Sequence, residues 1–498
     1  MAKPEITENV LQKRRAGILL HITSLPSNYG NGDLGAEAYH FIDFLQSTGI
    51  TVWQTLPLGY PHEDLSPYQC LSAHAGNPAL INIDWLEKKG WLKNIENCYD
   101  CQYGTRYLKN CLISKAYSGF QEKAPEAEKN AYSRFCQEHA FWLDDFVLFL
   151  ALKKVYGDKT WNEWPACFRD RDEQAILKAH RELSSFIEIA KFEQFVFFSQ
   201  WHELKDYAHQ HGVLMFGDIP IFVAYDSADV WAHPEVFKLD SDGKMTVVAG
   251  VPPDYFSATG QHWGNPHYNW QKLEETGFKW WLNRMRTQID LFDIIRIDHF
   301  RGLEAAWEIP AEDDTAINGR WVNAPGDALL TTIFDTFGHI PLVAEDLGII
   351  TDEVEVLRDK FNLPGMKVLQ FAFGGGADNP YLPHNYHPNC VVYTGTHDND
   401  TTVGWFSKLS EQEKHVIQEY LGDTSESIPY ALIQTAFASV ANMAVIPMQD
   451  VLVLNSDHRM NTPGTIEGNW IWRFSWNQLN ELKVKKLTHL VELFDRGN

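Results

Sequence analysis

Three short apolar runs in this chain are each followed within three residues by a segment that carries acidic side chains. Runs of this kind, largely apolar rather than alternating, are typical of parallel strands that helices cover on both faces. The runs and the acidic segments are residues 292–295 and 296–300, 340–343 and 344–348, and 390–393 and 396–400. Because the carboxyl ends of parallel strands in a barrel meet at one mouth, the sequence predicts that these acids converge in space.

Eight apolar runs in total read as strands, and most are separated by segments with helical spacing such as residues 279–289, 353–361 and 411–421. The predicted strands are residues 16–20, 51–56, 213–216, 293–297, 341–344, 366–373, 389–393 and 443–448. This alternation predicts an α/β fold, a single catalytic (β/α)8 TIM barrel that extends over residues 1–498.

A barrel of this type needs about 250 residues, so large inserted subdomains are expected in the βα loops. Residues 84–212, between the second and third strands, are predicted to form a mostly helical insertion, with helices at 140–155 and 175–189. Residues 225–269 lack sustained periodicity and are interpreted as a loop-rich insertion. After the eighth strand there is room for a closing helix at 477–494 and no separate C-terminal β-domain.

The composition limits the classes of ligand. With 66 acidic and 42 basic residues and a net charge of −24, the chain would repel nucleic acid and anionic membranes. Aromatic residues make up 13% of the chain, including 18 Trp, and such rings stack on the apolar faces of sugars, although most will serve the core. The N-terminus lacks a signal-peptide run and no stretch is apolar enough for a membrane span, so a cytoplasmic protein is expected.

The seven cysteines imply no disulfide framework. Cys98 and Cys101 have redox or zinc spacing, but there is no second pair and no nearby cluster of His, so no metal site is predicted. The zinc, phosphate-loop and nucleophile-elbow motifs are also absent from the sequence. The acids are therefore the strongest chemical signal.

Two of the acids suit the cleavage of a glycosidic bond with retention, which needs a carboxylate nucleophile and a carboxyl that gives and takes a proton. Asp298 and Glu345 fit these roles, and Arg296, on the same strand face as Asp298, is expected to hold Asp298 ionised. Two alternatives stay open from the residues alone. Arg296 and Asp298 could form a structural ion pair. Asp346 could be the acid in place of Glu345, because adjacent side chains on an extended strand face opposite sides and only one of the two can reach the cleft.

Residues 250–264 are predicted to form a lid over the mouth. The segment carries three aromatic residues, Tyr255, Phe256 and Trp263, among Gly and Pro, with Asp254 available to bind a hydroxyl. Such a lid would exclude water and favour transfer to a sugar over hydrolysis. The alternative is an ordinary surface loop anchored by its aromatic residues.

Six motifs in one order resemble those of the amylomaltases, the 4-α-glucanotransferases of glycoside hydrolase family 77, which are relatives of the α-amylases. They are residues 17–26 (GILLHITSLP), 66–69 (SPYQ), 217–223 (GDIPIFV), 296–302 (RIDHFRG), 344–348 (AEDLG) and 396–399 (THDN). The resemblance covers residues 17–474. It implies a barrel with inserted subdomains, no cofactor, and transfer of α-1,4-glucan segments between maltooligosaccharides or linear glucans as donor and acceptor.

The resemblance also implies roles for individual residues. Asp298 would be the nucleophile, Glu345 the acid/base, and Asp398 the third acid, which stabilises an oxocarbenium-like ring. Tyr68 resembles the ring that stacks on the transferred glucose. Four further residues are candidates for binding sugar hydroxyls: His397 and Asn399 beside Asp398, His299 beside Asp298, and Asn461, which with residues 469–470 matches family segments.

Two rival functions stay open. A retaining α-glucan hydrolase would use the same acids, and the predicted lid is what separates it from a transferase. A non-catalytic glucan-binding scaffold would use only the aromatic mouth, and the presence of all three acids argues against it.

Overall fold

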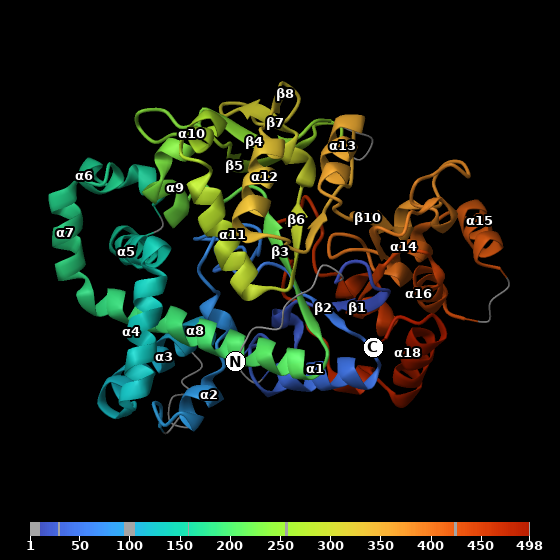
Figure 1. Ribbon diagram of the computed structural model, residues 1–498, viewed down its shortest axis with the longest axis horizontal. Helices are drawn as coiled ribbons and strands as arrows, with labels where there is room; N and C mark the ends of the chain where they lie inside the picture. The colour runs from blue at the N-terminus through green and yellow to red at the C-terminus, as the bar shows by residue number, and fades with distance from the viewer. Residues whose placement is uncertain are drawn as a thin grey trace.

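Eight parallel strands form the centre of the computed structural model, which describes residues 10–27, 30–93, 105–157, 159–253, 257–422 and 426–497 (Figure 1). The strands are β1 (Arg15–Leu19), β2 (Val52–Gln54), β3 (Leu214–Pro220), β6 (Ile294–Asp298), β9 (Leu342–Ala344), β10 (Gly365–Val368), β11 (Cys390–Tyr393) and β12 (Met443–Pro447). They pair in the order β10-β11-β12-β1-β2-β3-β6-β9. The amide of Ala344 donates to the carbonyl of Pro364 at 2.9 Å and joins the two outer strands, which confirms the predicted (β/α)8 barrel.

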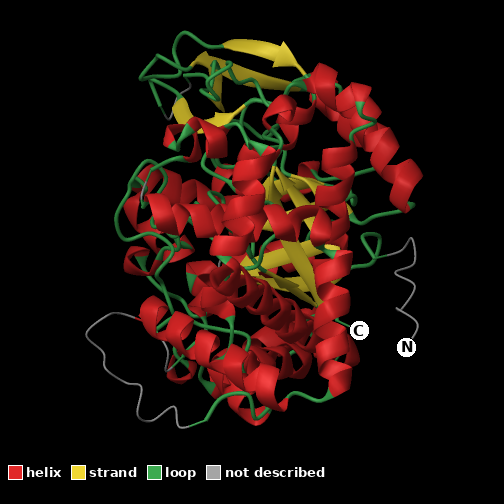
Figure 2. Cartoon of the chain, turned by 90° about the vertical axis from the view of Figure 1, so that its left-hand side faces the viewer, coloured by secondary structure: helices red, strands yellow, loops and turns green. Residues whose placement is uncertain are grey.

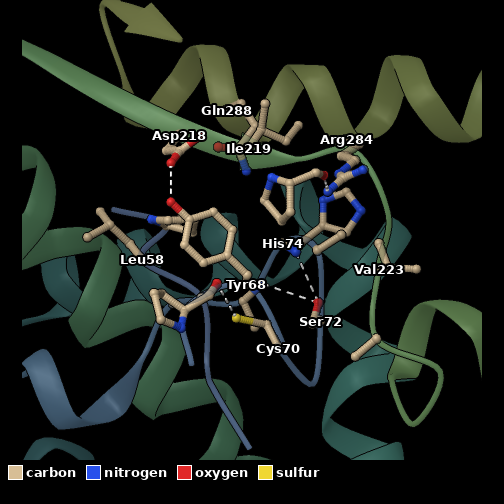
Figure 3. Close-up of a pocket in the computed structure, with 18 of the residues that line it drawn as sticks. Leu58, Tyr68, Cys70, Ser72, His74, Asp218, Ile219, Val223, Arg284 and Gln288 are labelled. Carbon is tan, nitrogen blue, oxygen red and sulfur yellow. Dashed lines mark hydrogen bonds between the residues drawn. The ribbon is translucent and has the colours of Figure 1, made fainter. Parts of the chain in front are cut away.

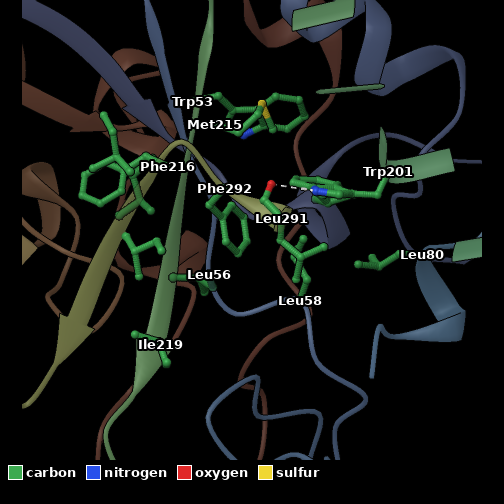
Figure 4. Close-up of a cluster of buried hydrophobic side chains, with 14 of the residues drawn as sticks. Trp53, Leu56, Leu58, Leu80, Trp201, Met215, Phe216, Ile219, Leu291 and Phe292 are labelled. Carbon is green, nitrogen blue, oxygen red and sulfur yellow. Dashed lines mark hydrogen bonds between the residues drawn. The ribbon is translucent and has the colours of Figure 1, made fainter. Parts of the chain in front are cut away.

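Helices surround the barrel because each strand is buried on both faces and needs an apolar cover. The covering helices include α1 (Ala36–Ser47), α8 (Ser184–Gln210), α11 (Lys279–Leu291), α12 (Gly326–Phe337), α13 (Asp352–Lys360), α14 (Thr402–Lys408), α16 (Ile428–Ala438) and α18 (Glu481–Leu493). Helix α15 (Glu411–Leu421) packs against α16 at the outer edge of the molecule (Figure 1). Figure 4 shows part of this packing, where Trp201 of α8 lies against Phe292 and donates its indole N–H to the carbonyl of Leu291 at 2.9 Å.

The segment between β2 and β3 is mostly helical and extends away from the barrel at the left of Figure 1. It contains α2 (Ile83–Lys88), α3 (Thr105–Lys123), α4 (Glu126–Glu138), α5 (Ala140–Tyr156), α6 (Ala166–Arg169) and α7 (Glu173–Glu182) before α8. The single helix predicted at 175–189 is wrong, because α7 ends at Glu182 and Leu183, with φ of −103° and ψ of 12°, interrupts the helical path before α8 begins.

A second, antiparallel sheet lies beyond the barrel and was not predicted (Figure 2). Its order is β5-β4-β7-β8, with the bounds β4 (Val247–Val251), β5 (Gln261–Pro266), β7 (Ala305–Pro310) and β8 (Arg320–Asn323). The segment 225–269 also contains the short helix α9 (Ala228–Ala232), and α10 (Trp270–Glu275) follows it. These strands lacked a sequence signal because β4 is completed by β7, which belongs to a different loop of the barrel.

Two further boundaries differ from the prediction. The strand predicted at 366–373 ends at Val368, where a 3-10 turn over Leu369–Phe371 begins. The closing helix begins at Glu481 rather than at 477, since Asn480 caps it by accepting a hydrogen bond from the amide of Lys483 at 3.0 Å. After β12 and the short helix α17 (Met448–Val451), the described residues form 3-10 turns, loops and α18 without another strand.

No helix within the described part of the chain combines the length and the apolar character needed to cross a membrane. The cysteines among the described residues are free thiols, and Cys98 and Cys101 lie outside those residues.

Candidate active site

The three predicted acids lie at the carboxyl ends of their strands. Asp298 is the last residue of β6, Glu345 directly follows β9, and Asp398 lies in the loop after β11. The pairing of β6 with β9 continues past the strand ends, because the amide of Glu345 donates to the carbonyl of Ile297 and the amide of Phe300 donates to that of Glu345, both at 3.0 Å. The barrel thus brings acids from distant parts of the sequence to one mouth.

Arg296 is the centre of a buried hydrogen-bond network. Its Nε and Nη2 donate to the two carboxylate oxygens of Asp218 at 2.9 and 2.6 Å, a bidentate pair. The same Nη2 donates to Asp298 at 2.8 Å and to the hydroxyl of Tyr68 at 3.0 Å. The ion pair that was an alternative reading of Arg296 and Asp298 is therefore present, but it faces the cleft and includes Asp218, which was not predicted as a site residue.

Tyr68 joins this network to the far side of the mouth. Its hydroxyl donates to Asp218 at 2.6 Å, the contact drawn in Figure 3. Its ring stacks on His397, with centroids 5.3 Å apart and an interplanar angle of 14°, and lies 6.0 Å from the ring of Trp470. Trp470, to which no role was assigned, also lies 5.9 Å from His397. The three rings form one cluster, which we call the aromatic cluster.

Behind Tyr68 is a small cavity between the loop after β2, the end of β3 and α11 (Figure 3). Two of its polar lining residues are bonded within the protein, since His74 Nδ1 lies 2.8 Å from the hydroxyl of Thr287 and Arg284 Nη1 donates to the carbonyl of Ile221 at 2.9 Å. The cavity lies beside the catalytic network through Tyr68 and Asp218, which both line it.

The two adjacent acids after β9 face different surroundings. Glu345 accepts hydrogen bonds from the amides of His299 at 2.7 Å and Leu347 at 3.1 Å, beside Asp298. Asp346 points into the barrel wall, where it accepts from the amide of Met366 at 2.7 Å and from Arg358 at 2.6 Å. Glu345 thus lies at the mouth, whereas Asp346 stabilises the barrel wall through its bonds to Met366 and Arg358.

Asp398 is held at the opening of the site, where its side chain is 48% exposed. Asn461 donates to one carboxylate oxygen at 2.6 Å, and His397 Nε2 lies 3.3 Å from the other. Arg459, a contact that was not predicted, donates to the backbone carbonyl of Asp398 at 2.8 Å. Loss of solvent acts to raise the pKa of Asp398, but His397 and the bond from Asn461 outweigh it and lower that pKa.

Comparisons with known proteins agree with this geometry. A family model described as 4-alpha-glucanotransferase matches residues 20–479. The chain belongs to this family. It is 49% identical to a 4-alpha-glucanotransferase of Thermus thermophilus, covering 97% of this chain and 99% of that one, and 47% identical to one of Synechocystis, covering 98% and 99%. The solved amylomaltase of Streptococcus agalactiae in complex with acarbose has a TM-score of 0.94 at 38% identity, covering 98% of this chain and all of that one.

As a member of the 4-alpha-glucanotransferase family the chain is an enzyme of that class. The pKa values of its two central carboxyls are both raised. Burial and the negative charge of Asp218 raise the pKa of Asp298 to about 6 against the opposing effect of Arg296. Burial and the charge of Asp298 raise the pKa of Glu345 to about 8. The charge of Asp298 thus favours a state of this glucanotransferase in which Asp298 is ionised and Glu345 keeps its proton.

The prediction that Arg296 would hold Asp298 ionised omitted the cost of burial. Arg296 does lower the pKa of Asp298, but removal from water has the larger effect and the net shift is upward. Arg296 limits the rise in the pKa of Asp298 and so favours its carboxylate form.

Two predicted hydroxyl-binding residues have local roles. His299 has a left-handed backbone with φ of 52°, which is uncommon for a residue with a side chain, and its ring meets Trp263 edge to face at 4.8 Å. Asn399 accepts from the amide and the hydroxyl of Thr396 at 2.8 and 2.9 Å, which closes a tight turn that contains Asp398. Hydroxyl binding by either residue stays a prediction.

The predicted lid is part of a hairpin. In the antiparallel pair β4 and β5, Val251 faces Gln261 and Gly250 faces His262, so residues 252–253 and 257–260 lie beyond the paired strands at the tip. Trp263 on β5 reaches the site through its contact with His299. Asp254, Tyr255 and Phe256 lie outside the described residues, so their place in a lid stays a prediction.

Proposed function

We propose that the chain transfers segments of α-1,4-glucan between maltooligosaccharides through a covalent glycosyl intermediate on Asp298. The observation that carries this proposal is that the paired strands β6 and β9 place two carboxyls next to each other, Asp298 bonded to Arg296 at 2.8 Å and Glu345 bonded to the amide of His299 at 2.7 Å. Burial raises the pKa of both carboxyls, and the charge of Asp298 favours the protonated form of Glu345. One ionised carboxylate and one protonated carboxyl are what retaining cleavage of a glycosidic bond requires.

In the first step, the Asp298 carboxylate attacks the anomeric carbon while Glu345 gives its proton to the departing glycosidic oxygen. The carbon–oxygen bond to the leaving sugar breaks as the ester bond to Asp298 forms. In the second step, Glu345 takes the proton of the acceptor's 4-hydroxyl, whose oxygen displaces Asp298 from the same carbon. Two inversions leave the α-configuration unchanged and restore both carboxyls.

The remaining residues act by binding. Asp398, ionised because its pKa is lowered, is suited to hold sugar hydroxyls and to stabilise positive charge on the ring. The aromatic cluster of Tyr68, His397 and Trp470 offers flat faces to a glucose unit. Linear α-1,4-glucans would serve as donor and acceptor, in keeping with the acarbose complex of the Streptococcus agalactiae relative.

Exclusion of water would favour transfer over hydrolysis. We assign this to the predicted lid at 250–264, based on the hairpin that brings Trp263 to the site. We also interpret residues 84–212 and 225–269 as insertions that wall the cleft, and a cytoplasmic location stays a prediction from the sequence.

Incubation with maltotriose tests the activity. Free glucose and longer dextrins at a constant number of reducing ends would support transfer. A rise in reducing ends would instead identify a hydrolase, and no reaction would favour a binding scaffold.

A glycosyl fluoride tests the covalent step. In Glu345→Gln, a maltosyl fluoride can still react with Asp298 because fluoride leaves without a proton, whereas the second step lacks its base. Mass spectrometry should then find the added sugar on the peptide that contains Asp298. An unmodified enzyme after fluoride release would contradict the covalent intermediate.

A further inference from the structure

Asp450 is a buried acid that lies outside the catalytic network. It belongs to the short helix α17, directly after β12, and its side chain is about 1% exposed. A fully buried carboxylate is costly unless hydrogen bonds satisfy it, so its partners indicate why it is there.

The partners of Asp450 are the two ends of a single loop. The hydroxyl of Thr394 donates to Oδ2 at 2.5 Å, and Thr394 is the first residue after β11. The hydroxyl of Thr402 donates to the same oxygen at 2.7 Å and its amide donates to Oδ1 at 2.8 Å, and Thr402 is the first residue of α14. Both threonines are fully buried.

The loop between these threonines carries His397 and Asp398. One carboxylate therefore fixes the distance between the point where this loop leaves the barrel and the point where it returns. Gln370, in the 3-10 turn that follows the neighbouring strand β10, adds a bond from its side-chain amide to the carbonyl of Asp400 at 2.8 Å. Support of this kind, behind the groups that meet the substrate, sets how accurately those groups are placed.

We infer that Asp450 is a positioning residue, which sets the placement of Asp398 and His397 by holding both ends of their loop. This inference rests on the proposed function, in which Asp398 stabilises the reacting ring. A displacement of about 1 Å in such a group can lower a rate about 100-fold, so loss of Asp450 should reduce kcat far more than it changes KM.

The test compares Asp450→Asn with Asp293→Asn. Asp293 is as deeply buried, at 2% exposed, and accepts from the amide of Met215 at 2.8 Å and from His209 at 2.9 Å, but it lies at the opposite end of β6 from Asp298. Both variants should lose thermal stability. At a temperature where both stay folded, Asp450→Asn should lose about 10- to 100-fold in kcat on maltotriose while Asp293→Asn stays near the parent value.

A second pair of variants covers the case in which Asp450→Asn does not fold. Thr394→Val removes one hydroxyl from Asp450 and should lower kcat, whereas Thr394→Ser keeps the hydroxyl and should retain it. Normal kcat in folded Asp450→Asn, or in folded Thr394→Val, would overturn the inference.

Asp398→Ala separates this failure from failure of the proposed function. If Asp398→Ala is inactive while the Asp450 and Thr394 variants are normal, only the positioning role is wrong. If Asp398→Ala keeps full activity, the role proposed for Asp398 is wrong and the inference falls with it.

Discussion

The backbone amide of His299 donates a hydrogen bond of 2.7 Å to the carboxyl of Glu345. His299 follows Asp298 in the chain, and its left-handed backbone, with φ of 52°, turns this amide toward the neighbouring strand. Such a conformation costs about 1–2 kcal/mol for a residue with a side chain. The structure accepts this cost at the point where the two central carboxyls must be held together, as strained residues at functional sites often do.

We expect the activity to show a bell-shaped dependence on pH. The proposed reaction needs Asp298 ionised, so kcat/KM should rise through about pH 6, and it needs Glu345 protonated, so kcat/KM should fall above about pH 8. Initial rates of glucose release from maltotriose across this range measure both limbs. A profile that keeps rising above pH 8 would contradict the acid role of Glu345.

Glu345→Gln should abolish transfer and stabilise the fold at pH 7. Because the folded pKa of Glu345 is raised, the unfolded chain ionises this group more readily, and native stability falls as pH rises from its ordinary pKa to about 8. Glutamine removes this penalty, and with allowance for partial exposure we expect a gain of about 1–3 kcal/mol in urea unfolding.

Asp398→Asn is the matched control for the sign of this effect. The pKa of Asp398 is lowered in the folded state, so its ionised carboxylate stabilises the fold above the ordinary pKa of an aspartate. The neutral amide of asparagine should lose that stabilisation at pH 7. Equal shifts in the same direction for both variants would show that charge is not the cause.

Arg296→Lys should lower kcat/KM about 100-fold although it conserves the charge, because an ammonium group cannot reproduce the bidentate pair with Asp218 while also reaching Asp298 and Tyr68. Arg296→Met removes the charge as well, so the pKa of Asp298 should rise further and the acidic limb of the pH profile should move upward. Circular dichroism should verify that each variant is folded, and an unmoved acidic limb in Arg296→Met would refute the electrostatic role.

Tyr68→Phe and Trp470→Ala should affect different kinetic constants. Phenylalanine keeps the ring of the aromatic cluster but loses the hydroxyl bonded to Asp218, so kcat should fall more than KM changes. Removal of the Trp470 ring should raise KM for maltotriose about 2- to 10-fold through lost stacking. Steady-state kinetics on maltotriose distinguishes the two effects, and an unchanged KM in Trp470→Ala would place that ring outside the sugar site.

The sequence could predict the barrel strands because each is short, apolar and buried on both faces, so its residues alone carry the signal. The strands of the four-stranded sheet have no comparable apolar pattern in the sequence. Strand β4 has half-buried ends, and its partner β7 begins more than 50 residues later in the chain, so only the folded structure brings the two together.

Asp218 was missed for a related reason. The predicted third strand stopped at residue 216, whereas β3 continues to Pro220, and its pairing with β6 sets Asp218 directly beside Arg296. Asp450 gave no sequence signal at all, since a single acid after an apolar run resembles any helix start. The role inferred for Asp450 depends on its hydrogen bonds to two threonines that lie about fifty residues away in the chain.

The small sheet also has a consequence for exchanging parts between relatives. Strands β4 and β5 come from the connection between β3 and β6, whereas β7 and β8 come from the connection between β6 and β9, yet they share one set of hydrogen bonds. Exchange of one connection alone would require β4 and β7 from two different proteins to pair, and a mismatch there would leave strand edges unpaired. The two connections should therefore be exchanged together, although β6, the strand that ends in Asp298, separates them in the chain.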